Sequence, residues 1–196
     1  MEDLYLENEE RFGPVTSFLY SLCSGLSRMG KLYKFVGDDV KGIGWKSVLD
    51  VGTGPGDIPI LLSKSFKSRG IYAVDPSGPM INISKRRSKG LGIHFALGSS
   101  RSVPFKRKFD LIISTLSFHH WGERERSLRY LAGFLSKNGQ IRIYEFERRE
   151  LRGISRYFAS AHSAAKEEMV SIARVSGLKI AGILQKDGYI RISMKR

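Results

Sequence analysis

Residues 48–57 combine a carboxylate with three glycines at alternate positions, in the order Val-Leu-Asp-Val-Gly-Thr-Gly-Pro-Gly-Asp. Glycine allows a sharp turn from a strand into a helix and leaves no Cβ between a ligand and the main-chain N–H groups. The stretch is therefore typical of a loop that binds a nucleotide cofactor. A dinucleotide loop has a further glycine where this chain has Asp57, and its helix start receives a pyrophosphate. A carboxylate at that position repels phosphates and favours a cofactor that has none.

A second carboxylate, Asp75, ends the short apolar run at residues 70–75. An acid at this position can accept hydrogen bonds from both hydroxyls of a ribose. Dinucleotide-binding folds share this geometry, so Asp75 alone does not separate the two classes of cofactor.

Together these segments resemble the class I S-adenosylmethionine-dependent methyltransferases, whose first motif D-x-G-x-G-x-G is matched by residues 50–56. The resemblance covers about residues 45–146, and the stretch 109–121 is similar to the type 11, quinone-biosynthesis-like branch. It implies S-adenosylmethionine as the cofactor, which is a sulfonium cation with a ribose, an adenine and an amino-acid tail. It also implies that the protein is a methyltransferase enzyme.

The resemblance further implies a set of cofactor contacts. It places Asp75 on the ribose and Met80 against the adenine, and it puts Ser99 where the family has an acid that accepts the adenine amino group. A hydroxyl is uncharged and shorter than that acid, so weaker cofactor binding is expected. The full expected set is Asp50, Gly52, Thr53, Gly54, Gly56, Asp75, Pro76, Met80, Gly98, Ser99, Ser100 and Ser114.

His119 and His120 are the candidate catalytic residues, because they follow the expected fourth strand. Either could act as general base for an acceptor that carries a proton at neutral pH. The alternative is a histidine that packs or bonds to the backbone. Residues that follow the fifth strand are expected to hold the acceptor, because ligands of open parallel sheets bind beyond the carboxyl ends of the strands: Arg148, Arg149, Tyr157 and His162.

The periodicity predicts a single α/β domain over residues 1–196, with a helical N-terminal lid segment at 1–44 and a cofactor-binding core at 45–196. The core is expected to be a doubly wound, Rossmann-like sheet of about seven strands. Asn138-Gly139 is expected to end a helix, and Asp187-Gly188 to form the turn of a C-terminal antiparallel hairpin. Strands are expected near 47–51, 71–75, 93–97, 109–114 and 140–146, and helices near 14–41, 58–66, 78–88, 123–136 and 164–176.

The chain carries 33 Lys and Arg against 19 Asp and Glu, a net charge of +14. Such a surface attracts polyanions such as RNA, but the charged surface of a thermophile protein gives the same composition, and both readings stay open. The basic runs at 85–89 and 106–108 are expected to be solvated helix ends and loops opposite the cofactor. The arginines among residues 148–156 are the better candidates for contact with an anionic substrate.

The acidic N-terminus and the absence of a long apolar run predict a cytoplasmic protein without a membrane segment. The single cysteine, Cys23, excludes a zinc site made of several cysteines, and no metal is expected. The predicted function is methyl transfer to an unidentified acceptor, with a small molecule slightly favoured. A methyltransferase that acts on RNA or protein and an inactive, methyltransferase-like binding module remain alternatives, and the sequence does not indicate the oligomeric state.

Overall fold

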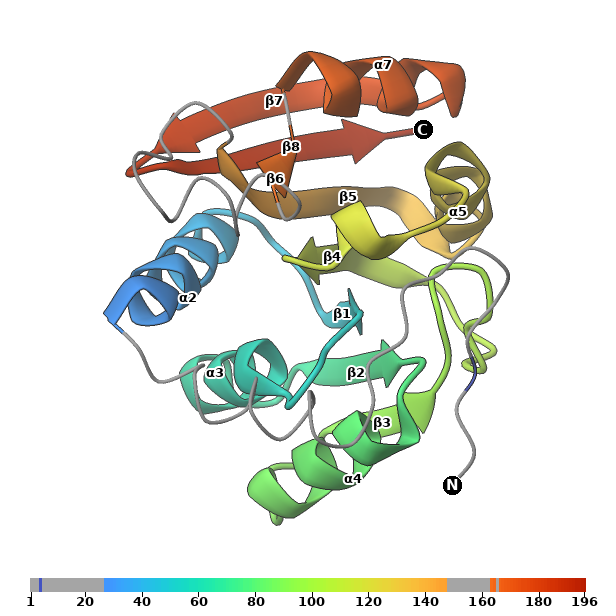
Figure 1. Cartoon of the computed structure of the whole chain (residues 1–196). Coiled ribbons are helices and arrows are strands. Elements are labelled where there is room, and N and C mark those ends of the chain that lie inside the picture. Colours follow the sequence, from blue (N-terminus) through green and yellow to red (C-terminus); the bar gives the residue numbers. More distant parts are fainter. Residues whose placement is uncertain (1–3, 5–26, 148–162, 165) are drawn as a thin grey trace.

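The computed structural model describes Leu4 and residues 27–147, 163–164 and 166–196. One sheet runs through the molecule in the strand order β3-β2-β1-β4-β5-β8-β7, with a short β6 beside β5 (Figure 1). Its strands are β1 (Ser47–Val51), β2 (Gly70–Asp75), β3 (His94–Leu97), β4 (Phe109–Thr115), β5 (Leu135–Glu147), β6 (Ser163–Ala164), β7 (Lys179–Lys186) and β8 (Tyr189–Lys195).

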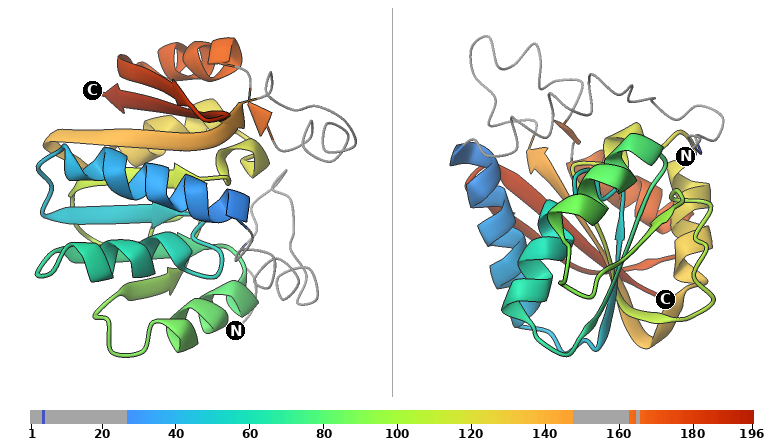
Figure 2. Two further views of the ribbon diagram at one scale, coloured as in Figure 1. Left: turned by 90° about the vertical axis from the view of Figure 1, so that its left-hand side faces the viewer. Right: turned by 90° about the horizontal axis from the view of Figure 1, so that it is seen from below.

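Helices cover both faces of the sheet (Figures 1 and 2). They are α2 (Ser27–Lys41), α3 (Asp57–Ser65), α4 (Gly78–Arg87), the short 3-10 turn η1 (Phe118–His120), α5 (Arg124–Ala132) and α7 (Lys166–Val175). In the sheet order, the first five strands, which are β3, β2, β1, β4 and β5, pair in parallel. Strand β8 pairs antiparallel with both β5 and β7. The predicted doubly wound sheet and C-terminal hairpin are therefore confirmed. No helix in the described ranges is both long and apolar enough to span a bilayer.

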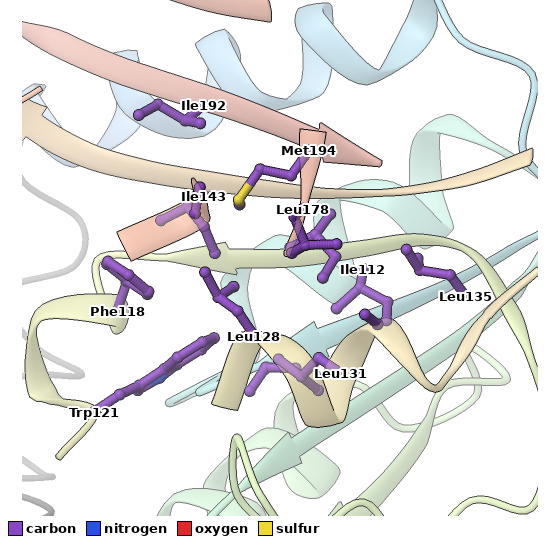
Figure 3. Close-up of a cluster of buried hydrophobic side chains, with 14 of the residues drawn as sticks. Ile112, Phe118, Trp121, Leu128, Leu131, Leu135, Ile143, Leu178, Ile192 and Met194 are labelled. Atoms are coloured by element: carbon purple, nitrogen blue, oxygen red, sulfur yellow. The ribbon is translucent and has the colours of Figure 1, made fainter. Parts of the chain in front are cut away.

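The sheet separates two hydrophobic cores because side chains alternate along each strand. Ile112 of β4 packs into the core under α5 and α7 (Figure 3), while its neighbour Ile113 packs under α2 and α3. In the same way, Ile143 of β5 packs into the core under α5 and α7, and Tyr144 packs into the core under α2 and α3. Of the helix expected near 14–41, residues 27–41 form α2, and residues 14–26 lie outside the described residues.

The predicted helix end at Asn138-Gly139 is wrong. Helix α5 ends at Ala132, and β5 already begins at Leu135. The register of β5 against β4 then shifts, so that residues 136–139 form an irregular bulge. A Cβ on Gly139 would lie 2.7 Å from the Phe109 carbonyl oxygen, so close packing of two strands, and not a left-handed helix cap, requires this glycine.

The predicted helix at 164–176 also begins later than expected. Ala164 pairs with Glu147 in the short strand β6, and α7 starts at Lys166.

Asp39 fastens α2 to the sheet. Its Oδ2 accepts hydrogen bonds from Arg142 Nη1 at 2.5 Å and from the Tyr144 hydroxyl at 2.8 Å, and Oδ1 accepts one from Arg191 Nη2 at 3.1 Å. Burial, followed by the Asp39 charge, raises the pKa of the Tyr144 hydroxyl, so this group stays a donor. The cluster joins α2 to β5 and β8 and fixes the helix that borders the functional cleft.

Replacing Asp39 should destabilise the fold strongly. Asp39→Asn leaves the buried Arg142 and the half-buried Arg191 without a charged partner, which costs about 3–5 kcal/mol. Urea unfolding measures the difference. Asp38→Asn on the same helix is the matched control, since Asp38 is an exposed acid paired with Lys34 and Lys41, and it should change the midpoint little. An equally small effect at Asp39 would contradict the role of this cluster.

Candidate functional site

A cleft opens beyond the carboxyl ends of β1, β2 and β4, at the point where the chain connections leave the sheet in opposite directions. Its empty space, including the open mouth, is about 930 Å³. The N–H of Leu4 reaches the rim of the cleft and donates to Pro76 O at 2.7 Å. The fold thus places the cleft where ligands of open α/β sheets bind.

Most of the residues expected to contact the cofactor meet in this cleft. Those that line it are Asp50, Gly52, Thr53, Gly54, Asp75, Pro76, Met80, Ser99 and Ser100. Three others lie behind its wall. Gly56 packs against Ser84 and Phe95, Gly98 lies under Ser102 O, and Ser114 is buried.

The expected acceptor residues Arg148, Arg149, Tyr157 and His162 lie outside the described residues, as do Arg152, Arg156 and Cys23.

The main-chain N–H groups of the glycine-rich loop already donate hydrogen bonds within the protein. The N–H groups of residues 52–53 both donate to Val74 O, at 2.9 and 3.0 Å, and Gly54 N–H donates to Asp75 Oδ2 at 2.7 Å. Gly56 N–H donates to a carbonyl of the loop itself at 3.1 Å. The sequence suggested that a ligand approaches these N–H groups, but they are not available to hold a pyrophosphate.

Gly52 is required for a different reason. Its φ of 75° lies in the left-handed region, and a Cβ there would lie only 1.8 Å from Ser117 Oγ. Ser117 in turn accepts a hydrogen bond from Trp121 Nε1 at 3.2 Å. The absence of a side chain at Gly52 lets the segment that carries the two histidines pack directly on the cofactor loop.

Asp50 is a buried acid that faces the cleft, and its Oδ1 has no hydrogen-bond partner among the described residues. Burial, with the nearby charges of Asp75 and Asp57, raises the pKa of its carboxyl to about 7. A buried carboxyl oxygen without a hydrogen-bond partner is costly, and a cation in the cleft would compensate for it. The residue therefore fits a positively charged ligand group.

Asp57 does not present a free charge to the cleft. Its Oδ1 accepts from Arg87 Nη2 at 2.5 Å, and its Oδ2 accepts from the Tyr33 hydroxyl at 3.1 Å. Arg87 also donates to Pro55 O at 2.9 Å. Because Arg87 neutralises Asp57, the repulsion of phosphates expected from the sequence is weakened.

Asp75 has a structural role as well as a place in the cleft. Its Oδ1 accepts from Ser77 N–H at 2.9 Å, and its Oδ2 holds Gly54. Ser99, which stands in the place of the family acid, has its Oγ 3.2 Å from Arg101 N–H and lines the cleft.

The two histidines occupy different places in the turn η1. His120 lines the cleft, whereas the side chain of His119 is only 6% exposed and its Nδ1 lies 2.9 Å from Glu145 Oε2. Glu145 is fully buried, and its hydrogen bond with Nδ1 fixes the orientation of the His119 ring. The ring centroids of the two histidines are 3.9 Å apart. His120 is thus backed by an oriented histidine–glutamate pair.

Two further residues hold η1 in place. Leu116, just before the turn, has φ 52°, an unfavourable conformation for a side-chain-bearing residue that costs about 1–3 kcal/mol. Arg124 donates from Nη2 to His119 O at 3.0 Å and from Nη1 to Glu168 of α7 at 2.5 Å. Leu116 lies at the start of the segment that brings His120 to the cleft, and Arg124 anchors this segment to α7.

Sequence reasoning missed Glu145, Leu116 and Arg124. Glu145 had a visible signal, because the alternation of β5 puts it on the same face as Ile141 and Ile143, where a charge is unexpected. The positive φ of Leu116 and the contacts of Arg124 depend on tertiary packing. In the described part of the chain no three His, Cys, Asp or Glu side chains gather as a metal site would need.

Comparison with known proteins places these features in a family. Residues 48–139 match the family model described as methyltransferase domain. The chain is 33% identical over 101 residues to the demethylmenaquinone methyltransferase of Thermotoga maritima, an alignment that covers 51% of this chain and 43% of that protein. Residues 48–139 therefore resemble methyltransferase domains, as the sequence resemblance to the class I S-adenosylmethionine-dependent methyltransferases implied. The chain spans less than half the length of this curated relative.

Solved structures of methyltransferases share the fold. A SAM-dependent methyltransferase from Aquifex aeolicus aligns over 94% of this chain and 98% of its own, with TM-score 0.75 and 21% identity. PigF with SAH aligns over 94% of this chain and 60% of its own, with TM-score 0.76 and 14% identity. The expected family resemblance is confirmed, and the findings support S-adenosylmethionine as the methyltransferase cofactor.

The raised pKa of Asp50 predicts a pH dependence of stability. Between about pH 4 and pH 7 the unfolded chain loses this proton before the folded chain does, so the ligand-free fold loses up to about 4 kcal/mol from this group as pH rises. Asp50→Asn should flatten this part of the profile and leave the free energy of unfolding at neutral pH unchanged or higher. Urea midpoints across the same pH window measure it.

Asp110→Asn serves as a control of opposite sign. Hydrogen bonds from Lys46, Ser136 and Ser47 lower the pKa of the Asp110 carboxyl despite the opposing effect of burial. Asp110 therefore stabilises the fold above its unfolded pKa, and its replacement should reduce stability at neutral pH. Equal losses for both variants would show that Asp50 is not a strained acid.

Proposed function

We propose that the protein transfers a methyl group from S-adenosylmethionine to a small-molecule acceptor held in the cleft. The observation that carries the proposal is the buried Asp50 carboxylate, unpaired at Oδ1, beside a loop whose N–H groups are already bonded. This arrangement suits a cofactor that is cationic and free of phosphate. When bound, the cofactor supplies a methyl group on sulfur, and the C–S electron pair returns to sulfur as the acceptor forms its bond to the methyl carbon.

Each side of the cofactor has a candidate partner in the cleft. Asp50 is suited to the ammonium of the amino-acid tail, and the Asp75 carboxylate, at the end of β2, to the ribose hydroxyls. Met80 is buried at the wall beside Ser99, where the adenine would pack. These residues bind and orient the cofactor, which is most of what an in-line displacement asks of a protein.

The remaining apolar and aromatic residues that line the cleft indicate the kind of acceptor. Met29 and Tyr33 of α2 face this space, together with Leu116 and Trp121 from the segment after β4. Such a lining favours a small, largely apolar or aromatic molecule. The name of the Thermotoga maritima relative, a demethylmenaquinone methyltransferase, is consistent with an acceptor of this kind.

His120 is the group placed to accept a proton from the acceptor. It lines the cleft, and His119 behind it is fixed by Glu145. The acceptor's proton moves to a ring nitrogen of His120 as its electron pair attacks the methyl carbon. Glu145 and His119 act as positioning residues. Glu145 fixes the imidazole ring of His119, and the ring of His120 packs against it.

Calorimetry should show tight binding of S-adenosylmethionine and much weaker binding of NAD. Asp50→Asn should weaken binding of S-adenosylmethionine by about 1.5–3 kcal/mol, the range for a hydrogen bond to a charged group. Asp38→Asn, on the outer face of α2, should leave the dissociation constant unchanged. Tighter binding of NAD would contradict the cofactor assignment.

His120→Gln should lower kcat about 10²–10⁴-fold and remove the acidic limb of the pH profile, while cofactor affinity stays the same. The assay measures radiolabelled methyl transfer to a panel of hydroxylated aromatic acceptors that includes demethylmenaquinone. Arg129→Gln, an exposed change on α5, is the control. Unchanged kcat in His120→Gln would exclude the histidine as the base.

A further inference from the structure

Cations line the end of the sheet opposite the cleft. In the left view of Figure 2 this end holds the C-terminus and the connection from α2 to β1. A Lys or Arg stands at or directly before the start of β2, β1, β4 and β7, and at the end of the antiparallel β8, and Lys137 lies in the irregular first part of β5. We call these residues the basic row, which consists in sheet order of Lys67, Arg69, Lys46, Lys106, Arg107, Lys108, Lys137, Lys195 and Lys179.

The basic row lacks acidic partners. None of its side chains forms an ion pair with a described carboxylate, and all are exposed except the half-buried Arg69. Asp110, the acid nearest to the row along the chain, is occupied by the N–H groups of Lys46 and Ser47 and by Ser136. A thermophile surface organises its charges into ion-pair networks, so unpaired cations argue against that reading.

Two lysines of the basic row form a like-charge pair across neighbouring strands. Lys179 and Lys195 lie directly opposite each other on β7 and β8. Like charges in that position destabilise a sheet. A repulsive pair of this kind reduces stability, and a bound polyanion would offset the repulsion.

Two arginines of the row are held against aromatic rings. The Arg107 guanidinium carbon lies 4.4 Å from the Tyr72 ring centroid, and the Arg69 carbon lies 4.4 Å from that of Trp45. The exposed His94 stacks on Tyr72 with 4.6 Å between ring centroids and 16° between ring planes. These contacts order the cations and place an accessible ring beside them.

We propose that the basic row binds the phosphate backbone of a single-stranded nucleic acid without reading its sequence. Neighbouring strands lie about 4.8 Å apart, so the row from β2 to β7 extends over about 24 Å. A line of cations beside a stacking ring matches the backbone and bases of a single strand. The cleft opens at the other end of the sheet, so the nucleic acid and the cofactor do not compete, and this role is separate from the proposed methyl transfer.

The experiment compares two variants with the same change in net charge. The row variant carries Lys67→Gln, Lys106→Gln and Lys137→Gln, and the control carries Lys31→Gln, Lys166→Gln and Lys186→Gln. The control residues are exposed and lie near the starts of α2 and α7 and at the end of β7, at the other end of the sheet. Fluorescence anisotropy with a labelled oligouridylate measures affinity over a salt series. The row variant should bind about tenfold or more weakly, with a salt slope lower by about 2 units, and the control should change less than about threefold.

A second variant tests the repulsive pair. Lys179→Gln with Lys195→Gln should weaken oligouridylate binding and leave the melting temperature equal or higher, because a like-charge contact is removed. Oligothymidylate should bind like oligouridylate, since the backbone is the shared feature. Equal weakening in both triple variants, no binding at low salt, tighter binding of a duplex, or equal binding of polyglutamate, which would indicate an acidic protein partner, would each overturn the proposal.

Discussion

The glycine-rich loop keeps its shape because the end of β2 accepts its N–H groups. Val74 O receives two of them and the Asp75 carboxylate a third. With its donors satisfied, the loop leaves β1 in left-handed turns, and Gly52 comes so close to Ser117 that a side chain would not fit. The same few bonds therefore set the position of the cofactor loop and of the histidine turn that packs on it.

Three acids of low exposure differ in the number of partners that the protein supplies to their carboxyl oxygens. Asp39 accepts hydrogen bonds from two guanidinium groups and a phenol, and it holds α2 against the sheet. Glu145 has one partner, His119, and one oxygen without any described partner. Asp50 has a raised pKa and an unpaired oxygen. Compensation within the protein decreases towards the cleft, as expected where a ligand completes the site.

Much of the fold could be predicted, because parallel strands are apolar runs separated by helical patterns and turn residues. The end of α5 could not, since Asn138-Gly139 is a strong local turn signal and only the pairing of β5 with β4 assigns it to a bulge. The state of Asp57 was equally hidden, because its partner Arg87 lies thirty residues further along the chain. Local pattern predicts elements, and pairings between distant residues decide the electrostatics of the site.

Sheet polarity explains why the two ends of this molecule differ in charge. Parallel strands all finish at one edge, so acids that end or follow strands, such as Asp50, Asp75 and Glu145, gather around the cleft. The same polarity brings the starts of the strands, with their cations, to the other edge. The acids favour a cationic cofactor and repel a polyanion, while the basic row does the reverse. A domain with a high net positive charge can therefore bind a sulfonium at one end and phosphates at the other, because the two fields are separated by the length of the strands.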